Sequence, residues 1–214
     1  MFRLPSTRTT SWPVMLTGGL SSLVLALGMT PTFASFTASI GNSINAAGLG
    51  TLVMQETNAA GTITCLSTDG GGISVNLATC STINKYGGEL GMSAGSSVVT
   101  VANIKNVGTV DATTFALTPG LCTQSANGAM TGTATDLCSK ITVTITSGAA
   151  TIFSGTAAAL GAGGTIDVLA TTATAKLTAG AQKSFTITAT VDPAMGNIYQ
   201  GLKVSQPMTW AFSA

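Results

Sequence analysis

The chain has 214 residues, of which 7% are charged and 45% hydrophobic, and its formal net charge is +1. This balance provides no basic face for nucleic acid and no polybasic segment for lipid headgroups, so we expect neither partner. Apolar residues are frequent and evenly spread, which excludes a disordered chain, and the length suggests one domain.

The first 34 residues are predicted to be an export signal. Two Arg residues precede an apolar stretch at 14–29, and Thr32-Phe33-Ala34 places small residues at the −3 and −1 positions of a cleavage site. A signal peptidase would then cut between Ala34 and Ser35, leaving no stable membrane span. The alternative is an uncleaved anchor, although two Gly and two Ser weaken the stretch as a span. We expect a protein that is released from the cell or held at its surface by other proteins.

Short runs that alternate apolar and polar residues follow the signal, and Gly, Asn and Asp separate them. Alternation with a period of two is typical of strands, and the separating residues are typical of turns. Residues 96–108 and 113–120 are expected to form a hairpin, and 155–164 to hold one helical turn. Pro207 is expected at an edge or a bulge. The expected strands are 35–40, 51–57, 62–67, 73–81, 96–108, 113–120, 140–148, 151–155, 165–170, 183–191 and 201–214.

This spacing predicts an all-β fold, a single jelly-roll or β-sandwich domain of about ten short antiparallel strands. The chain divides into a signal peptide at 1–34, an N-terminal strand with its hinge at 35–47, and the sandwich at 48–214. No internal repeat or long linker argues for a second domain.

The four cysteines all follow the signal and form two local pairs, fifteen and sixteen residues apart. Four cysteines allow three pairings, of which the simplest is Cys65–Cys80 with Cys122–Cys138. Each bridge would add on the order of 3 kcal/mol of stability. The alternative is a zinc site, which is disfavoured because the chain has no Cys-x-x-Cys spacing and no His.

The sequence contains no arrangement typical of catalysis. Without His, a Ser-His-Asp triad and a HExxH zinc helix are excluded. The seven acidic residues are spread singly, so no adjacent carboxylate pair suggests hydrolysis. We therefore expect no enzyme, no cofactor and no metal. One further chemistry is an isopeptide crosslink between Lys105 and a cross-strand Asn, assisted by Glu56 or Glu89.

Three stretches together resemble the TasA/camelysin-like family of secreted fibre proteins. The first, "ASFTASIGNSINAAGLGTLVM", is residues 34–54, and the second, "MSAGSSVVTVANIKNVGTVDATTFAL", is residues 92–117. The third covers residues 177–214, and its "GNIYQGL" before a final aromatic strand is the most specific. The chain departs from the best-known members in its two cysteine pairs and its few charges. The metalloprotease activity described for camelysins is not carried over, because the chain has no His.

The resemblance implies a jelly-roll subunit of an extracellular filament, either a biofilm matrix fibre or a surface pilus. It also implies secretion to the extracellular matrix or cell surface of a Gram-positive bacterium. Its partners would be copies of itself in a head-to-tail polymer, with an accessory matrix protein as a further candidate. In this family the N-terminal segment of one subunit is thought to complete a sheet of the next. The alternative function is a monomeric binding or adhesion module of the cell surface with the same fold.

The segment behind the cleavage site fits such a donor strand. A strand that pairs with a neighbour's sheet edge gains ladder hydrogen bonds and buries alternate side chains. Thr37 and Ser39 would face outward, and "GNSIN" would act as a hinge. Pairing of this strand within its own domain stays open as the alternative. The side chains expected to face the acceptor are Phe36, Ala38, Ile40 and Ile44.

Overall fold

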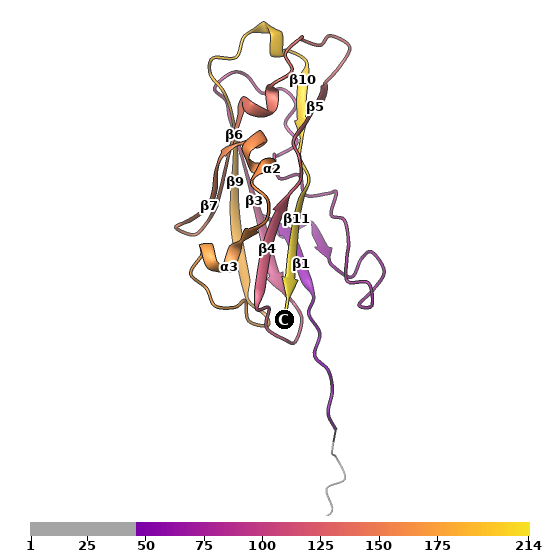
Figure 1. Ribbon diagram of the computed structural model, residues 1–214. Helices are drawn as coiled ribbons and strands as arrows, with labels where there is room; N and C mark the ends of the chain where they lie inside the picture. The colour runs from indigo at the N-terminus through magenta and orange to yellow at the C-terminus, as the bar shows by residue number, and fades with distance from the viewer. Residues whose placement is uncertain (1–45) are drawn as a thin grey trace, which may run out of the picture. The chain divides into compact units, whose positions relative to one another are not determined.

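The computed structural model describes residues 46–214 (Figure 1). The predicted signal peptide, the Ala34–Ser35 cleavage site and the donor strand from Phe36 to Ile44 therefore lie outside the described residues. Residues 48–214 form one compact unit with its own hydrophobic core. That unit is an all-β sandwich of antiparallel strands, as the sequence predicts.

One layer is a six-stranded antiparallel sheet. Its two longest strands, β3 and β9, pair along nine residue positions at the centre, where inward apolar side chains alternate with outward polar ones. In spatial order the sheet consists of β2 (Thr64–Leu66), β1 (Met54–Asn58), β3 (Ser97–Asn106), β9 (Gln182–Val191), β6 (Ile141–Ser147) and β7 (Ala150–Thr156).

The other layer is made of two short sheets that continue one another along the molecule. The three-stranded sheet has the order β11 (Met208–Ser213), β4 (Thr114–Pro119) and β8 (Ile166–Asp167). The two-stranded sheet pairs β10 (Leu202–Ser205) with β5 (Thr123–Ala126). Figure 1 shows β10 above β11 and β5 above β4. Only Gln206 and Pro207 separate β10 from β11, so this stretch acts as one long strand.

Short helices fill the corners of the sandwich. Helix α2 (Ala157–Ala162) lies where a helical turn is predicted, and its first amides are capped by the Thr156 hydroxyl. Helix α3 (Val168–Thr171) begins behind Asp167, whose carboxylate accepts from the Ala170 amide. The predicted strand at 165–170 is therefore wrong beyond Asp167, because that side chain caps a helix. Two 3-10 helices, η1 (Leu137–Ser139) and η2 (Asn197–Tyr199), complete the set.

An aromatic cluster joins the two layers. The Phe115 ring from β4 meets the Phe185 ring from β9 edge-on, with centroids 5.7 Å apart. The Trp210 ring from β11 lies 4.5 Å from Phe185 and 5.7 Å from Phe115. Because each ring comes from a different strand, this cluster fixes how β11 sits over the six-stranded sheet.

The predicted hairpin of 96–108 with 113–120 is wrong. Strand β3 pairs with β1 and β9, whereas β4 pairs with β11 and β8 in the other layer. The buried Asn106 explains why the chain passes from one layer to the other between β3 and β4. Its side-chain amide donates to the Val110 and Leu177 carbonyls, and its oxygen accepts from the Gly108 amide. These bonds stabilise a corner in place of a tight β-turn.

The predicted strand at 73–81 is also wrong. Residues 67–96 contain no helix and no strand, and the alternating Ile73, Val75 and Leu77 are exposed. Asn76 has a φ of 47° in the left-handed region, which interrupts an extended chain. Its side chain accepts from the Ser67 hydroxyl and donates to the Leu52 carbonyl, so local bonds replace a ladder.

Replacing Phe115 by Ala is expected to lower the free energy of unfolding by about 3–5 kcal/mol, because the ring is fully buried in the aromatic cluster. Urea unfolding of a fragment of residues 46–214, which contains the whole core, measures the change. Val99→Ala in β3 is the matched control, since Val99 is 62% exposed and should cost little. A Phe115→Ala loss no greater than the control would contradict this account of the core.

Candidate functional site

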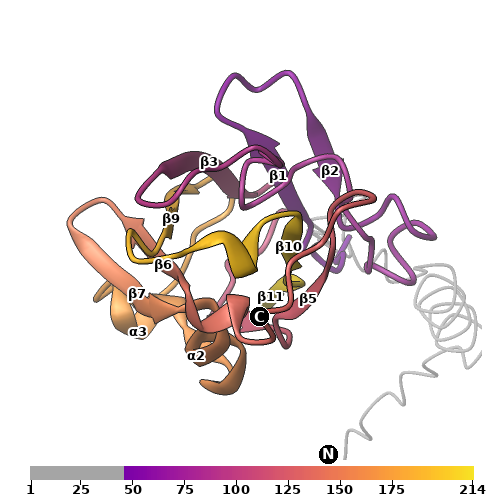
Figure 2. The ribbon, with the colours of Figure 1, turned by 90° about the horizontal axis from the view of Figure 1, so that it is seen from above.

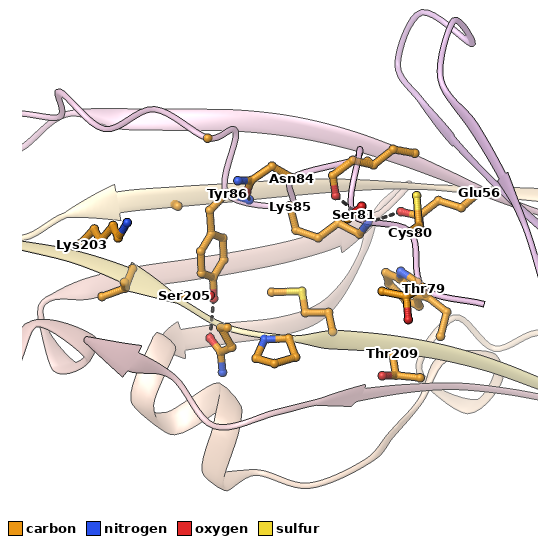
Figure 3. A pocket seen from close by; sticks show the side chains of 18 of the residues that line it. Glu56, Thr79, Cys80, Ser81, Asn84, Lys85, Tyr86, Lys203, Ser205 and Thr209 are labelled. Carbon is orange, nitrogen blue, oxygen red and sulfur yellow. Dashed lines mark hydrogen bonds and ion pairs between the residues drawn. The ribbon is translucent and has the colours of Figure 1, made fainter. Parts of the chain in front are cut away.

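A cavity of about 840 Å³ lies between strand β1 and the β10–β11 stretch, and we call it the edge groove (Figure 3). In the view from above, β10 lies between β5 on one side and β1 with β2 on the other (Figure 2). Every residue from Leu202 to Phe212 lines the edge groove, although inward and outward side chains alternate along this stretch. A strand that contributes all of its residues to a cavity presents its edge, and not only one face.

The backbone bonds of β10 and β11 show which groups face the edge groove. The Gly201 carbonyl accepts from the Asn127 amide at 2.7 Å, and the Pro207 carbonyl accepts from the Gly120 amide at 2.8 Å. Backbone groups alternate in direction along an antiparallel strand, so the odd-numbered residues bond to β4 and β5. The even-numbered residues then direct their amides and carbonyls to the opposite edge. They are Leu202, Val204, Met208, Trp210 and Phe212.

No strand among residues 46–214 pairs with that opposite edge, because β10 and β11 are the outermost strands of their sheets. The edge therefore offers a row of backbone donors and acceptors to an added strand. The Trp210 indole is buried, and its Nε1 has no hydrogen-bond partner within the described residues. Leaving a buried donor unpaired costs about 1–3 kcal/mol, which an entering polar group would recover.

The floor of the edge groove is apolar. It is formed by side chains of the six-stranded sheet, among them the buried Ile141, Ala189 and Val191. Met92 and Met195 line it as well and are half-buried. Methionine side chains adapt to irregular shapes, so this floor can pack against apolar side chains of different sizes.

An ion pair lies on the β1 side of the edge groove. The Glu56 carboxylate from β1 contacts the Lys85 ammonium, and their side chains are only 10% and 11% exposed. Lys85 also donates to the Ile83 carbonyl at 3.1 Å. Breaking such a pair by removing one partner is costly, because the other charge stays buried. The pair therefore holds residues 83–85 against β1.

Within residues 46–214, the structure places neither a cross-strand Asn nor an acidic side chain beside Lys105, as an isopeptide crosslink would require. Glu56 lies across from Ile104 in the register with β3, so Lys105 is on the opposite face of the sheet. The residues across from Lys105 are Gln55 and Gln182, and neither is Asn. The Glu89 carboxylate instead accepts from the Gly91 amide in its own loop. The structure therefore places neither an Asn across from Lys105 nor Glu56 on its face of the sheet, because side chains on adjacent residues of a strand point to opposite faces.

A second polar contact crosses the edge groove. The Tyr86 hydroxyl donates to the side-chain oxygen of Gln206, which lies between β10 and β11. The Gln206 nitrogen donates to the Gly120 and Ala157 carbonyls at 2.9 and 3.0 Å, so the acceptor is held firmly. Burial raises the pKa of the Tyr86 hydroxyl, which therefore stays protonated as a donor.

Both predicted disulfides are present. Cys65–Cys80 ties β2 to the irregular segment beside the edge groove, and both cysteines line the groove. Cys122–Cys138 ties the residue before β5 to helix η1. Cys65–Cys80 lies beside the edge groove, and Cys122–Cys138 lies next to β5, which pairs with β10. Each bridge limits how far the two segments that it joins can separate.

Residues 46–214 contain no group of three or more His, Cys, Asp or Glu that could hold a metal ion. Over the same range, no helix has the length and apolar character needed to cross a membrane. No family model matches this chain, and a search of curated proteins found no match. We therefore infer function from the geometry of the edge groove together with the sequence.

Of the residues that line the edge groove, the sequence singled out Cys65 and Cys80 for a disulfide and Glu56 for another role, and it did not predict the groove itself. The alternation in 201–214 predicts a strand but cannot show which of its edges stays open. Glu56, Lys85, Tyr86 and Gln206 lie far apart in the sequence, and no motif connects them. The one available signal was Trp210, the only Trp after residue 12.

Replacing Cys65 and Cys80 together by Ser is expected to speed amide hydrogen exchange in residues 67–81, because the bridge closes that segment onto β2. We expect a loss of roughly 2–4 kcal/mol in unfolding free energy as well. Hydrogen-exchange mass spectrometry measures the first effect. The control is Cys122→Ser with Cys138→Ser, which opens a loop of similar length and should leave exchange in 67–81 unchanged. Equal exchange in the two double variants would refute a local role for Cys65–Cys80.

Proposed function

We propose that this protein is a secreted structural subunit that polymerises into extracellular filaments, as a biofilm matrix fibre or a surface pilus. In this proposal the edge groove accepts the N-terminal strand of a neighbouring copy. The observation that carries it is that the cavity follows the open edge of β10–β11 along every residue from 202 to 212. A cavity along one strand edge has the shape of one more strand.

The donor strand is shorter than the acceptor stretch. The predicted strand, residues 35–40, would extend over about 20 Å at roughly 3.3 Å per residue, and the predicted hinge follows it at 41–45. The acceptor stretch from Leu202 to Ser213 has twelve residues, so the donor can pair along about half of it. Each added backbone pair would satisfy an amide or a carbonyl that no described strand satisfies.

The side chains of the predicted donor strand match the polarity of the edge groove. Phe36, Ala38 and Ile40 share one face of an extended strand, and the floor of the edge groove is apolar. Burying a Phe or an Ile side chain contributes about 1.5–3 kcal/mol each. Thr37 and Ser39 would then face solvent, as the exposed Lys203, Ser205 and Thr209 do on the acceptor strand.

Donor pairing between copies would produce a filament. The contact joins two different surfaces of the subunit, the N-terminal strand and the edge groove, and a contact of this kind does not close on itself unless its rotation forms a ring. Signal cleavage at Ala34 would free the donor strand only during export, so polymerisation would be confined to the outside of the cell. The two disulfides are typical of that oxidising environment.

The second candidate function is a monomeric surface module that binds a small apolar ligand. The volume of the edge groove, about 840 Å³, lies within the range of small-molecule sites. The side chains of Tyr86 and Trp210 line it and offer aromatic surface to a ring or a chain. Saturable binding of such a ligand by a subunit that forms no fibres would favour this candidate over the filament.

Deleting residues 35–44 from the exported chain is expected to leave a folded monomer that forms no fibres, because the compact unit begins at Gly48. Electron microscopy and light scattering of the concentrated protein measure polymer, and circular dichroism measures the fold. A synthetic peptide of residues 35–45 should bind the truncated chain and change the fluorescence of Trp210, its only Trp. Fibres of the truncated protein would refute the donor strand.

Point variants of the donor strand provide a matched comparison. Phe36→Asp and Ile40→Asp place a charge on the face that would enter the edge groove, and each is expected to abolish fibres. Thr37→Asp and Ser39→Asp add the same charge on the outward face and should reduce polymerisation far less. If all four variants behave alike, the assigned face of the strand is wrong.

A further inference from the structure

We infer that residues 83–86 are a latch that holds the edge groove closed in the free subunit and must release before a donor strand can enter. This inference rests on the proposed function and adds a conformational control to it. Its basis is that two consecutive side chains, Lys85 and Tyr86, bond to opposite walls of one cavity.

The latch reaches both walls at defined points. On one wall, the Lys85 ammonium pairs with the Glu56 carboxylate of β1. On the other, the Tyr86 hydroxyl donates to Gln206. Figure 3 shows the Tyr86 side chain pointing into the cavity, with a dashed line at its hydroxyl. Ile83 anchors the latch further, since its side chain is only 6% exposed and lines the groove.

The latch also lies where an added strand would need space. Gln206 is near the middle of the acceptor stretch, between β10 and β11. A donor strand paired with this edge would direct alternate side chains into the space that the Tyr86 ring now crosses. The ring and the inward face of a donor strand cannot occupy the same volume, because protein interiors are close-packed.

Few bonds hold the latch in place. Residues 79–86 make no backbone hydrogen bond to β1 or to β10–β11 in the described part of the chain. The local bonds, from Tyr86 and Gly87 amides to Asn84, lie within the segment and can move with it. Opening the latch costs the buried ion pair, the Tyr86 hydrogen bond and the packing of Ile83, but it breaks no ladder bond, so the sheets behind it stay intact. The latch can therefore open without unfolding the sandwich.

A latch of this kind would control when the donor strand binds. In the free subunit the Tyr86 and Lys85 contacts satisfy polar groups of both walls and cover apolar floor. The donor strand has to displace them, so the binding-competent population is a fraction of the total. Weakening the latch should raise the association rate of the donor and leave its dissociation rate unchanged, because the latch is already open in the bound state.

The test uses residues 46–214, which contain the complete core, with a synthetic peptide of residues 35–45. Stopped-flow fluorescence of Trp210 gives association and dissociation rates. Tyr86→Phe removes one hydrogen bond and should speed association about two- to tenfold. Lys85→Met combined with Glu56→Gln removes the ion pair without leaving a buried charge, and should act in the same direction. Hydrogen exchange in residues 79–92 should rise in both variants.

Tyr199→Phe is the matched control. Tyr199 also lines the edge groove, but its hydroxyl donates to Asp136 and does not join the two walls. Peptide binding with wild-type association rates in both latch variants would overturn the latch and leave the proposed function standing. A change confined to the dissociation rate would also overturn it. If the peptide binds none of the proteins, the proposed function fails and the latch fails with it.

Discussion

The structure depends on the hydrogen-bonding requirement of the β10–β11 backbone. Amides and carbonyls project from both edges of a strand, and β4 with β5 satisfies only one edge of this stretch. In the described part of the chain the other edge borders a cavity with an apolar floor. A buried backbone group without a partner is costly, so such an edge favours an additional strand. This open edge explains three features. The predicted donor strand would pair with it, the floor of the edge groove would pack against the donor's side chains, and the latch would control entry.

The aromatic cluster holds the strand with the open edge in a fixed position. Trp210 belongs to β11 itself, and its ring packs against Phe115 and Phe185 from both layers. Gln206 is bonded to Gly120 and Ala157, which holds the junction between β10 and β11. The acceptor strand is thus fixed in position by its inward side chains, and its own backbone needs no rearrangement once the latch has released. The latch is held less firmly than the acceptor strand, because its polar contacts across the groove are one ion pair and one hydrogen bond.

Much of the fold could be predicted from local patterns. The strands β6 and β9 alternate apolar and polar residues, and the local cysteine pairs suggested the disulfides that the structure contains. The errors arose where a side chain overrode the pattern. Asn106 redirects the chain to the other layer, Asp167 starts a helix, and Asn76 interrupts an alternating segment with a left-handed residue. Each depends on hydrogen bonds that residue spacing alone does not reveal.

The sequence by itself determined the all-β class and the apolar alternation of residues 36–40, because both follow from periodicity, and it favoured the local cysteine pairing that the structure contains. Only the tertiary structure decided which strand edge stays open and what faces it. Glu56 and Lys85 are 29 residues apart, and Tyr86 and Gln206 are 120 apart. Contacts at such separations depend on how the layers pack, and no local pattern encodes that packing. The edge groove and its latch are therefore properties of the folded chain, whereas the strand proposed to fill the groove is visible in the sequence.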